Sequence, residues 1–445
     1  MSSKTTSVPF VDTVRVAMEV LKGINSPRSL AVFMLCDAYL LDESRRDTDA
    51  FAAELGKISF STNWYDQFTI SEFRDDYCAT KLLSKLPPPD DSSALADRAI
   101  ASFKEGEAVS AGVTLAWLNE SLIDAKLYPY GVSIDDIRKT LRRVLGRAPS
   151  FQSLSDKGYF TEGASVLLPS REASAARKCE DGLSITPTLA SRLLSEGVSL
   201  NPMLNSRSGW FLSPGNLVTT VSKNIETDRT VAMEPEINAF FQRSIGDNIR
   251  SKLLRFGIDL NDQTLNQRAC MRALKESSAT IDLRNASNSD NARVCEVLLP
   301  YDWFDIIDHC RSKFGSFDKR SSIRDPNGVL RHGEWFEYSM LSSMGNGFTF
   351  ELESAMFYAI CVSCGVPDYD VYVYGDDIII PQQYVESVTS VLNICGFEVN
   401  KEKSFTSGAF FESCGVYAFH GVDVTPFKIK DLLYGNKACI VLANK

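Results

Sequence analysis

The sequence is poor in residues suited to soft-metal or disulfide chemistry. Only three histidines occur in 445 residues, and the eleven cysteines are odd in number and follow no framework spacing. We therefore expect reduced, mostly buried thiols of the kind found in cytosolic proteins. The single CxxC pair, Cys361 and Cys364, is expected to occupy core positions on a helix rather than to bind zinc.

Targeting signals and long apolar runs are also missing. Residues 1–6 lead into no apolar segment of the kind that a secretory signal requires. The longest apolar candidate, residues 30–41, is short and contains Asp37, so it falls well below the length of a membrane span. We expect no membrane segment.

An excess of positive charge is absent as well. The formal net charge is −10, which argues weakly against nucleic-acid binding when only the overall field is considered. A basic channel inside an acidic shell is compatible with the same net charge. With 44% hydrophobic and 23% charged residues the composition is that of a globular chain, and the length predicts about two to four domains.

Two adjacent carboxylates, Asp376 and Asp377, are the most informative feature that is present. They stand with Gly375 between two runs rich in β-branched residues, 371–373 and 378–380. This pattern predicts a tight hairpin with both carboxylates at its tip. Like charges this close repel each other, and a bound divalent cation would relieve the repulsion.

A third carboxylate, Asp282, lies at the end of a strand predicted at residues 278–283. If that strand neighbours the hairpin in one sheet, the three carboxylates converge. Oxygen ligands without histidine or thiolate favour Mg²⁺, for which Mn²⁺ can substitute. Two such ions can bind the attacking and the leaving oxygen of a phosphoryl transfer.

Basic side chains occur in three further places. The loop after residue 222 joins two predicted strands and carries Lys223 and Arg229, which can neutralise a triphosphate. Lys401 or Lys403 can protonate a leaving pyrophosphate as a general acid, and a solvated strand end is the competing interpretation. The cluster at 139–147 is either a solvated helix face or a phosphate contact.

A glycine-rich loop precedes a helix predicted from its apolar spacing. Gly345 permits close backbone approach to a ligand, while Ser343 and Asn346 offer hydrogen bonds suited to a ribose hydroxyl. Glu351 and Glu353 fall in the first turn of that helix, where negative charge suits the helix dipole.

The predicted elements after residue 276 follow the order strand, helix, loop and helix, hairpin, helix and strand. This order is an α+β arrangement with helices behind a sheet. Asn288 or Ser289 is expected to cap the first helix. The first 215 residues are expected to be mainly helical, and residues 311–334 are expected to form a polar surface insertion.

These motifs together resemble the RNA-directed RNA polymerases, or replicase β subunits, of single-stranded RNA bacteriophages of the levivirus group. The matching runs lie within about residues 217–430, near half of the chain, and occur in the family's order. They are Ser222–Arg229 with Glu234 and Pro235, Thr280–Leu283, Ser342–Ser354, Tyr374–Asp377, and Glu412–Gly415 through Gly421–Pro426.

The resemblance implies a right-hand polymerase with fingers and palm, an antiparallel palm sheet backed by helices, and a thumb that is largely missing. Relatives run on for roughly a further hundred residues of helical thumb. The expected parts are a mainly helical N-terminal region and fingers at 1–215, a basic fingers segment facing the incoming nucleotide at 216–275, the palm at 276–430, and the start of a truncated thumb at 431–445.

The resemblance also implies roles for individual residues. Asn288 stands where relatives carry a second aspartate, so ribose selection would depend on Asn346 or a water. The expected ligands of two Mg²⁺ ions are Asp282, Asp376 and Asp377, with Lys403 as a further catalytic residue. The expected nucleotide-binding residues are Lys223, Arg229, Ser343, Gly345, Asn346 and Asn288.

The partners implied by the resemblance are RNA template and product, nucleoside triphosphates, host translation elongation factors Tu and Ts, and a host ribosomal protein. The implied place of action is the cytoplasm of the bacterial host. Template-directed RNA synthesis accounts for the carboxylates, the basic loop and the glycine-rich loop together. The main alternative is a truncated, inactive polymerase that still binds RNA or host factors. A metal-dependent phosphatase or nuclease explains the carboxylates alone.

Overall fold

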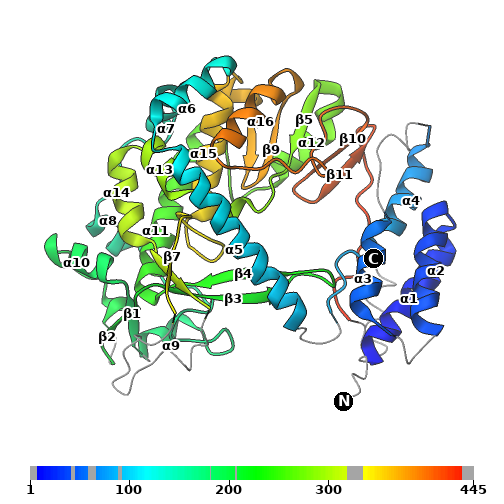
Figure 1. Ribbon diagram of the computed structural model, residues 1–445, viewed down its shortest axis with the longest axis horizontal. Helices are drawn as coiled ribbons and strands as arrows, with labels where there is room; N and C mark the ends of the chain where they lie inside the picture. Colours follow the sequence, from blue (N-terminus) through cyan, green and yellow to red (C-terminus); the bar gives the residue numbers. More distant parts are fainter. Residues whose placement is uncertain are drawn as a thin grey trace.

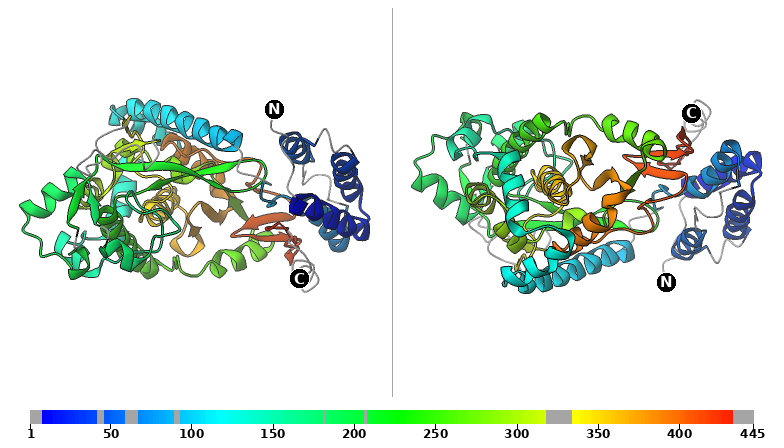
Figure 2. Two further views of the ribbon diagram at one scale, coloured as in Figure 1. Left: turned by 90° about the horizontal axis from the view of Figure 1, so that it is seen from below. Right: turned by 90° about the horizontal axis from the view of Figure 1, so that it is seen from above.

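The computed structural model describes residues 8–41, 46–58, 67–88, 93–180, 182–205, 208–317 and 334–432. They form helices and short strands, which confirms the predicted α+β class (Figure 1). Helices α1–α4 lie together at one end of the molecule in all three views (Figures 1 and 2). Within these ranges, no helix is both long enough and apolar enough to span a bilayer.

The N-terminal helices α1–α4 share an apolar core of their own. Two residues from distant parts of the chain, Ile225 and Ile429, complete this core. Helix α4 begins with a capping box in which Thr69 and Glu72 satisfy each other's backbone N–H groups. The four helices are α1 (Val8–Ile24), α2 (Pro27–Leu41), α3 (Thr48–Lys57) and α4 (Ile70–Lys81).

The following segment, to about residue 215, is mainly helical in its described part, as predicted. The long helix α5 runs along the β3–β4 hairpin (Figure 1). The two short strands of this segment, β1 and β2, pair in parallel. The elements are α5 (Ser93–Ala116), α6 (Glu120–Leu127), α7 (Ile134–Leu145), α8 (Phe151–Lys157), α9 (Ala175–Glu180), β1 (Leu183–Ile185), α10 (Pro187–Ser195) and β2 (Trp210–Leu212).

A four-stranded sheet carries the predicted basic loop at one end. The two strands expected on either side of that loop are confirmed as an antiparallel pair. The expected surface insertion at 311–334 is wrong at its start, because Arg311 is buried and the next residues form a strand of this sheet. Residues 318–333 lie outside the described part. In sheet order the strands are β4 (Asp228–Met233), β3 (Asn216–Ser222), β6 (Phe314–Ser316) and β7 (Phe336–Glu337).

A three-stranded antiparallel sheet contains the predicted hairpin. Gly375 has a φ of 61° at the turn, and an added Cβ would overlap the ring of Phe350, so glycine is required there. Helices α12 and α15 pack against this sheet. Its strands, in order, are β5 (Ser278–Ile281), β9 (Asp377–Pro381) and β8 (Tyr372–Tyr374).

Helix α15 (Thr349–Ser363) is enclosed along most of its length, since residue 349 and residues 351–361 are buried. Glu351 lies in the first turn of this helix as predicted, whereas Glu353 falls one turn later, so the prediction is wrong for Glu353. Glu351 accepts a hydrogen bond from Arg250 Nε at 2.6 Å, and Glu353 is 3% exposed.

The first helix after β5 begins later than predicted. Residues 286–288 form a 3₁₀ turn, and the side chain of Asn291 caps α13, so the expected caps Asn288 and Ser289 are wrong. The cysteines in the described ranges are all free thiols. The remaining elements are α11 (Glu236–Leu253), α12 (Thr264–Glu276), α13 (Ala292–Leu298), α14 (Tyr301–Cys310), α16 (Val385–Ile394), β10 (Phe410–Ser413), β11 (Val416–Phe419) and β12 (Val422–Asp423).

Candidate active site

The register of the three-stranded sheet brings the predicted carboxylates to one edge. Ile281 pairs with Ile378, so Asp282, which follows β5, comes beside Asp377, which begins β9. Asp376 is exposed in the hairpin turn next to them. Asp282 is almost a hundred residues from the Asp376–Asp377 pair in the sequence, and the strand register makes the three side chains neighbours.

Burial and neighbouring negative charge raise the pKa of Asp282 and Asp377. Burial is the first cause of the raised pKa of Asp282, and the charge of Asp376 adds to it. Burial followed by the same charge raises the pKa of Asp377 to about 6. Glu412 on β10 belongs to the same cluster, because burial and then the charges of Asp377 and Asp282 raise its pKa to about 7. Such mutual repulsion is relieved when a cation binds.

Hydrogen-bond donors hold two of the three carboxylates in place. Asn400 Nδ2 donates to Asp282 Oδ2 at 2.9 Å, and Lys403 Nζ lies 3.8 Å from the same oxygen. Ser413 Oγ donates to Asp377 Oδ1 at 3.1 Å. The predicted catalytic lysine is therefore beside the carboxylates, although the segment before it makes only an isolated bridge rather than a strand.

The donor set fits a hard divalent cation. It consists of carboxylate oxygens, with no histidine or thiolate, and repulsion among the charges favours a cation between them. Among the described residues, no three acidic, histidine or cysteine side chains already stand as a cluster able to hold an ion.

The basic loop lies within electrostatic range of this edge. Partial desolvation is the first cause of the lowered pKa of Lys223, followed by repulsion from Arg229 and Lys403, while the charge of Asp282 acts in the opposite direction. The side-chain oxygen of Asn224 accepts hydrogen bonds from two backbone N–H groups of the loop and closes it. Both predicted cations thus stand exposed at the tip of the β3–β4 hairpin.

The glycine-rich loop docks against β4. Ala232 N donates to Met344 O at 2.7 Å, and Gly345 has a φ of 110°. A Cβ on Gly345 would overlap the carbonyl oxygen of Ala232. Asn346 is half-buried, and its side-chain oxygen accepts from Phe348 N at 3.0 Å. Ser343, at 4% exposed, is enclosed by protein.

Asn288 lies at the end of the 3₁₀ turn after β5 and is half-buried. In the described part of the chain its Oδ1 is buried and has no hydrogen-bond partner. A buried acceptor without a donor is costly unless a ligand or water satisfies it.

A buried relay of hydrogen bonds, which no local sequence pattern predicts, holds the glycine-rich loop. Glu234 accepts hydrogen bonds from Asn216 at 2.9 Å, Gln242 at 3.1 Å and Ser312 at 2.6 Å. Gln242 Oε1 in turn accepts from Gly347 N at 3.1 Å. Glu234 belongs to a run that carries the family resemblance, but the hydrogen-bond partners of its side chain lie up to 78 residues away in the sequence.

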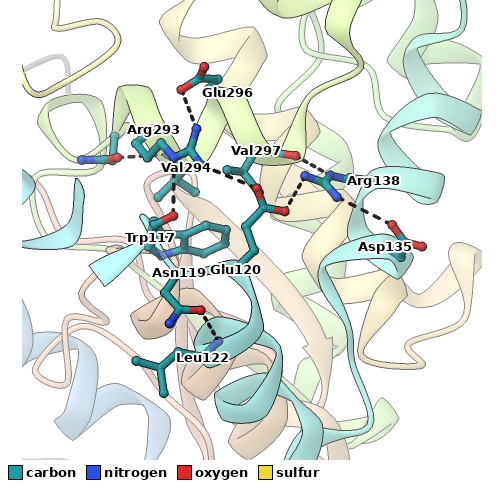
Figure 3. Close-up of polar contacts among 11 residues, drawn as sticks. Trp117, Asn119, Glu120, Leu122, Asp135, Arg138, Arg293, Val294, Glu296 and Val297 are labelled. Carbon is teal, nitrogen blue, oxygen red and sulfur yellow. Dashed lines mark hydrogen bonds and ion pairs between the residues drawn. The ribbon is translucent and has the colours of Figure 1, made fainter. Parts of the chain in front are cut away.

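The basic cluster at 139–147 lies elsewhere, on α7 and the turn after it. Within the cluster, Arg143 pairs with Asp368 at 2.7 Å and Arg142 with Asp302 at 3.8 Å. Two arginines beside it, Arg138 and Arg293, both pair with Glu120, at 3.0 and 3.5 Å (Figure 3). These ion pairs favour the interpretation as a solvated helix face. A cavity of about 430 Å³ opens on this side, and no residue of the candidate site lines it.

Comparison with known proteins gives a consistent match. A family model described as "RNA replicase, beta-chain" matches residues 43–445. The chain is 33% identical over 410 residues to the RNA-directed RNA polymerase subunit beta of Escherichia virus Qbeta, covering 88% of this chain and 65% of that protein. It is 34% identical over 323 residues to the RNA-directed RNA polymerase beta chain of Escherichia phage MS2, covering 70% of this chain and 57% of that protein.

The chain spans less than two thirds of the length of these two relatives. It is also 34% identical over 420 residues to the subunit beta of Qbeta virus (strain MX1), covering 90% of this chain and 67% of that protein. A solved structure titled "RdRp complex" overlaps 68% of this chain and 28% of that one, with 9% identity and a TM-score of 0.39, which does not establish a shared fold.

Proposed function

The chain belongs to the RNA replicase beta-chain family, and from this membership we propose that it catalyses RNA-directed RNA synthesis. A nucleoside triphosphate would be joined to the 3′ end of an RNA on an RNA template, and pyrophosphate would leave. The observation that carries the proposal is the neighbouring position of Asp282 and the Asp376–Asp377 hairpin at one sheet edge, within range of the basic loop.

We infer a right-hand arrangement for the fold. The β5–β9–β8 sheet with α12 and α15 would be the core of a palm at 276–430, and the β3–β4 hairpin would belong to fingers at 216–275. The helical region at 1–215 would complete the fingers. An antiparallel sheet backed by two helices, with the acidic hairpin at its edge, supports this division. Of the thumb start expected at 431–445, only the first two residues are described.

Asp282, Asp376 and Asp377 would hold two Mg²⁺ ions, for which Mn²⁺ can substitute. Divalent ions bound there would stabilise the charge that develops on the attacking and leaving oxygens. Burial, and after it the charge of Asp376, raises the pKa of Asp282 and Asp377, and a bound cation would favour their charged forms, which supports this role.

The chain's own cations would serve the phosphates. Lys223 and Arg229, exposed at the hairpin tip, would neutralise the incoming triphosphate. Lys403, which lies 3.8 Å from Asp282 Oδ2, would give its proton to the pyrophosphate oxygen as the phosphoryl bond breaks. The proximity of lysine and carboxylate supports this assignment.

The ribose would be read beside the glycine-rich loop. The unpartnered Oδ1 of Asn288 could accept a hydrogen bond from a sugar hydroxyl, and the amide of Asn346 could donate one. Gly345 would contribute close backbone approach. Because Ser343 is enclosed, we infer that it supports the loop rather than contacting the sugar directly.

RNA template and product and nucleoside triphosphates would be the substrates, in the cytoplasm of the bacterial host. The host elongation factors Tu and Ts and a host ribosomal protein are carried over from the family resemblance. The test is therefore run with and without them.

The test measures incorporation of labelled nucleotide into RNA in the presence of Mg²⁺. The wild-type chain is expected to incorporate, and Asp376→Asn is expected to reduce incorporation to background because a metal ligand is lost. Asp97→Asn, which changes an exposed carboxylate on α5, is the matched control. Undiminished incorporation by Asp376→Asn would contradict the assignment, and RNA binding without incorporation in either Mg²⁺ or Mn²⁺ would favour a non-catalytic RNA-binding role.

A further inference from the structure

Four lysines from two distant segments gather beside the candidate site. The backbone of Ile429 donates to Leu82 O at 2.8 Å, and Ile429 and Leu82 share the core of the N-terminal helices. This contact brings the end of α4 and the turn after it next to the segment after β12. The lysines, which we call the outer lysine cluster, are Lys81, Lys85, Lys428 and Lys430.

Two members of the cluster flank one pair of tyrosine rings. Lys81 Nζ lies 5.6 Å from the ring centroid of Tyr77, and Lys428 Nζ lies 4.5 Å from that of Tyr417. The two ring centroids are 5.4 Å apart, and Lys428 also donates to the Tyr417 hydroxyl at 2.8 Å. The two ammonium groups are therefore held on a packed aromatic base rather than on free stems.

This base adjoins the carboxylates. Tyr417 on β11 pairs directly with Glu412 on β10, the acidic residue whose pKa is raised by Asp377 and Asp282. The loop of the β3–β4 hairpin closes the other side, because Asn224 Nδ2 donates to Ser84 O at 3.3 Å. The cluster thus stands between the N-terminal helices, the basic loop and the candidate metal ligands.

The cluster holds four like charges close together, opposed chiefly by the carboxyl group of Glu412. Within the described ranges, none of its four lysines forms an ion pair, although Lys81, Lys85 and Lys428 are half-buried. Burial first, and repulsion from Lys85 and Lys81 as well, lowers the pKa of Lys428 to about 8 against the opposing charge of Glu412. Half-buried, unpaired like charges cost free energy that an anionic ligand would recover.

We propose that the outer lysine cluster binds the polyphosphate of a nucleoside triphosphate or the pyrophosphate that leaves. Compact ammonium groups on several segments can surround a small, highly charged anion, which they bind as point charges. The position beside Lys223 and Glu412 places such an anion next to the catalytic edge. The inference rests on the proposed function, because it names where that substrate or product binds outside the metal ligands.

The test measures equilibrium binding of ATP and of inorganic pyrophosphate to the full chain in EDTA, so that binding through divalent metal does not contribute. Lys81→Met with Lys428→Met is expected to raise both dissociation constants by roughly tenfold or more, from the loss of two charge-assisted contacts. The matched control is Lys126→Met with Lys157→Met, which removes two exposed lysines from α6 and α8 and should leave both constants unchanged. Lys81→Arg with Lys428→Arg should retain binding.

Competition separates the two sources of the ligand. If the incoming triphosphate is the occupant, tripolyphosphate displaces ATP, AMP does not, and the methionine variant raises the KM for nucleotide. If the leaving group is the occupant, the variant weakens inhibition by pyrophosphate and leaves that KM unchanged. Either pattern supports the proposal.

Unchanged ATP and pyrophosphate binding in the methionine variant would overturn the proposal. So would weakened RNA binding with unchanged polyphosphate binding, which would assign the lysines to an RNA backbone. Because the readout is binding in EDTA, it stays independent of catalysis. If the wild-type chain does not incorporate nucleotide but the methionine variant binds polyphosphate more weakly, the binding site is supported and the polymerase function is contradicted.

Discussion

Replacing Gly345 with alanine tests whether the glycine-rich loop must lie against β4. The φ of 110° at this position strains any side chain by about 1–3 kcal/mol, and the new Cβ would overlap the backbone oxygen of Ala232. Because a strand oxygen cannot move aside like a side chain, relief of the overlap should cost about another 1–3 kcal/mol. We expect Gly345→Ala to lower the free energy of unfolding by about 2–6 kcal/mol.

Gly408→Ala is the matched control, because Gly408 has a φ of 87° and nothing within 4 Å of an added Cβ. It should cost only the backbone strain, about 1–3 kcal/mol. Denaturant unfolding of both variants measures the difference, and the incorporation assay should show a loss for Gly345→Ala alone. Equal losses of stability and of activity in the two variants would refute the view that the loop is held by contact with β4.

Three further predictions concern residues around the site. Gln242→Leu removes the side-chain oxygen that accepts a hydrogen bond from Gly347 N. It should reduce discrimination between ribonucleotides and deoxyribonucleotides, measured as the ratio of their kcat/KM values. An unchanged ratio would exclude a role for the relay in positioning the loop. Lys403→Leu should lower the incorporation rate by about 10²–10⁴-fold, while Lys401→Leu should have little effect. Equal rates in the two variants would contradict the assignment of Lys403 as the general acid. Asp290 is fully buried, and desolvation raises its pKa to about 7. Because the folded chain then holds this proton more tightly than the unfolded chain, the free energy of unfolding should fall as pH rises from about 4 to about 7 and level off above that. Asp290→Asn should flatten the fall over this window, and an unaltered pH profile in denaturant unfolding would contradict this.

Much of the site could be predicted from the sequence because its signals are local. The alternation of β-branched residues around Gly375 and the acidic pair specify a hairpin within ten residues of chain. The strand before Asp282 is equally local. The sequence does not predict that these two strands are neighbours; the pairing of Ile281 with Ile378 shows that they are.

The errors arise where distant contacts override local patterns. The strand at 314–316 is only three residues long and contains a glycine, so it has no periodic signal and exists through pairing with β3 and β7. Glu353 falls in the second turn of α15 rather than the first, because the helix begins at Thr349. A 3₁₀ turn at residues 286–288 delays the start of α13, so Asn291 caps the helix in place of Asn288 or Ser289.

The outer lysine cluster could not be predicted from the sequence for the same reason. Lys81 and Lys428 are separated by most of the chain, and neither stands in a recognisable motif. The hydrogen bond between Ile429 and Leu82 brings their segments together. Glu412 stands in one of the runs that carry the family resemblance, but only the structure shows that it lies within range of Asp377 and Asp282.

The most direct measurement of the central claim is the anomalous scattering of Mn²⁺ in crystals of the chain. The account predicts a manganese peak coordinated by Asp282 together with Asp376 or Asp377, at an Mn–oxygen distance of about 2.2 Å. Manganese found only at other positions, with Asp282 still bound to Asn400 and Lys403, would contradict it.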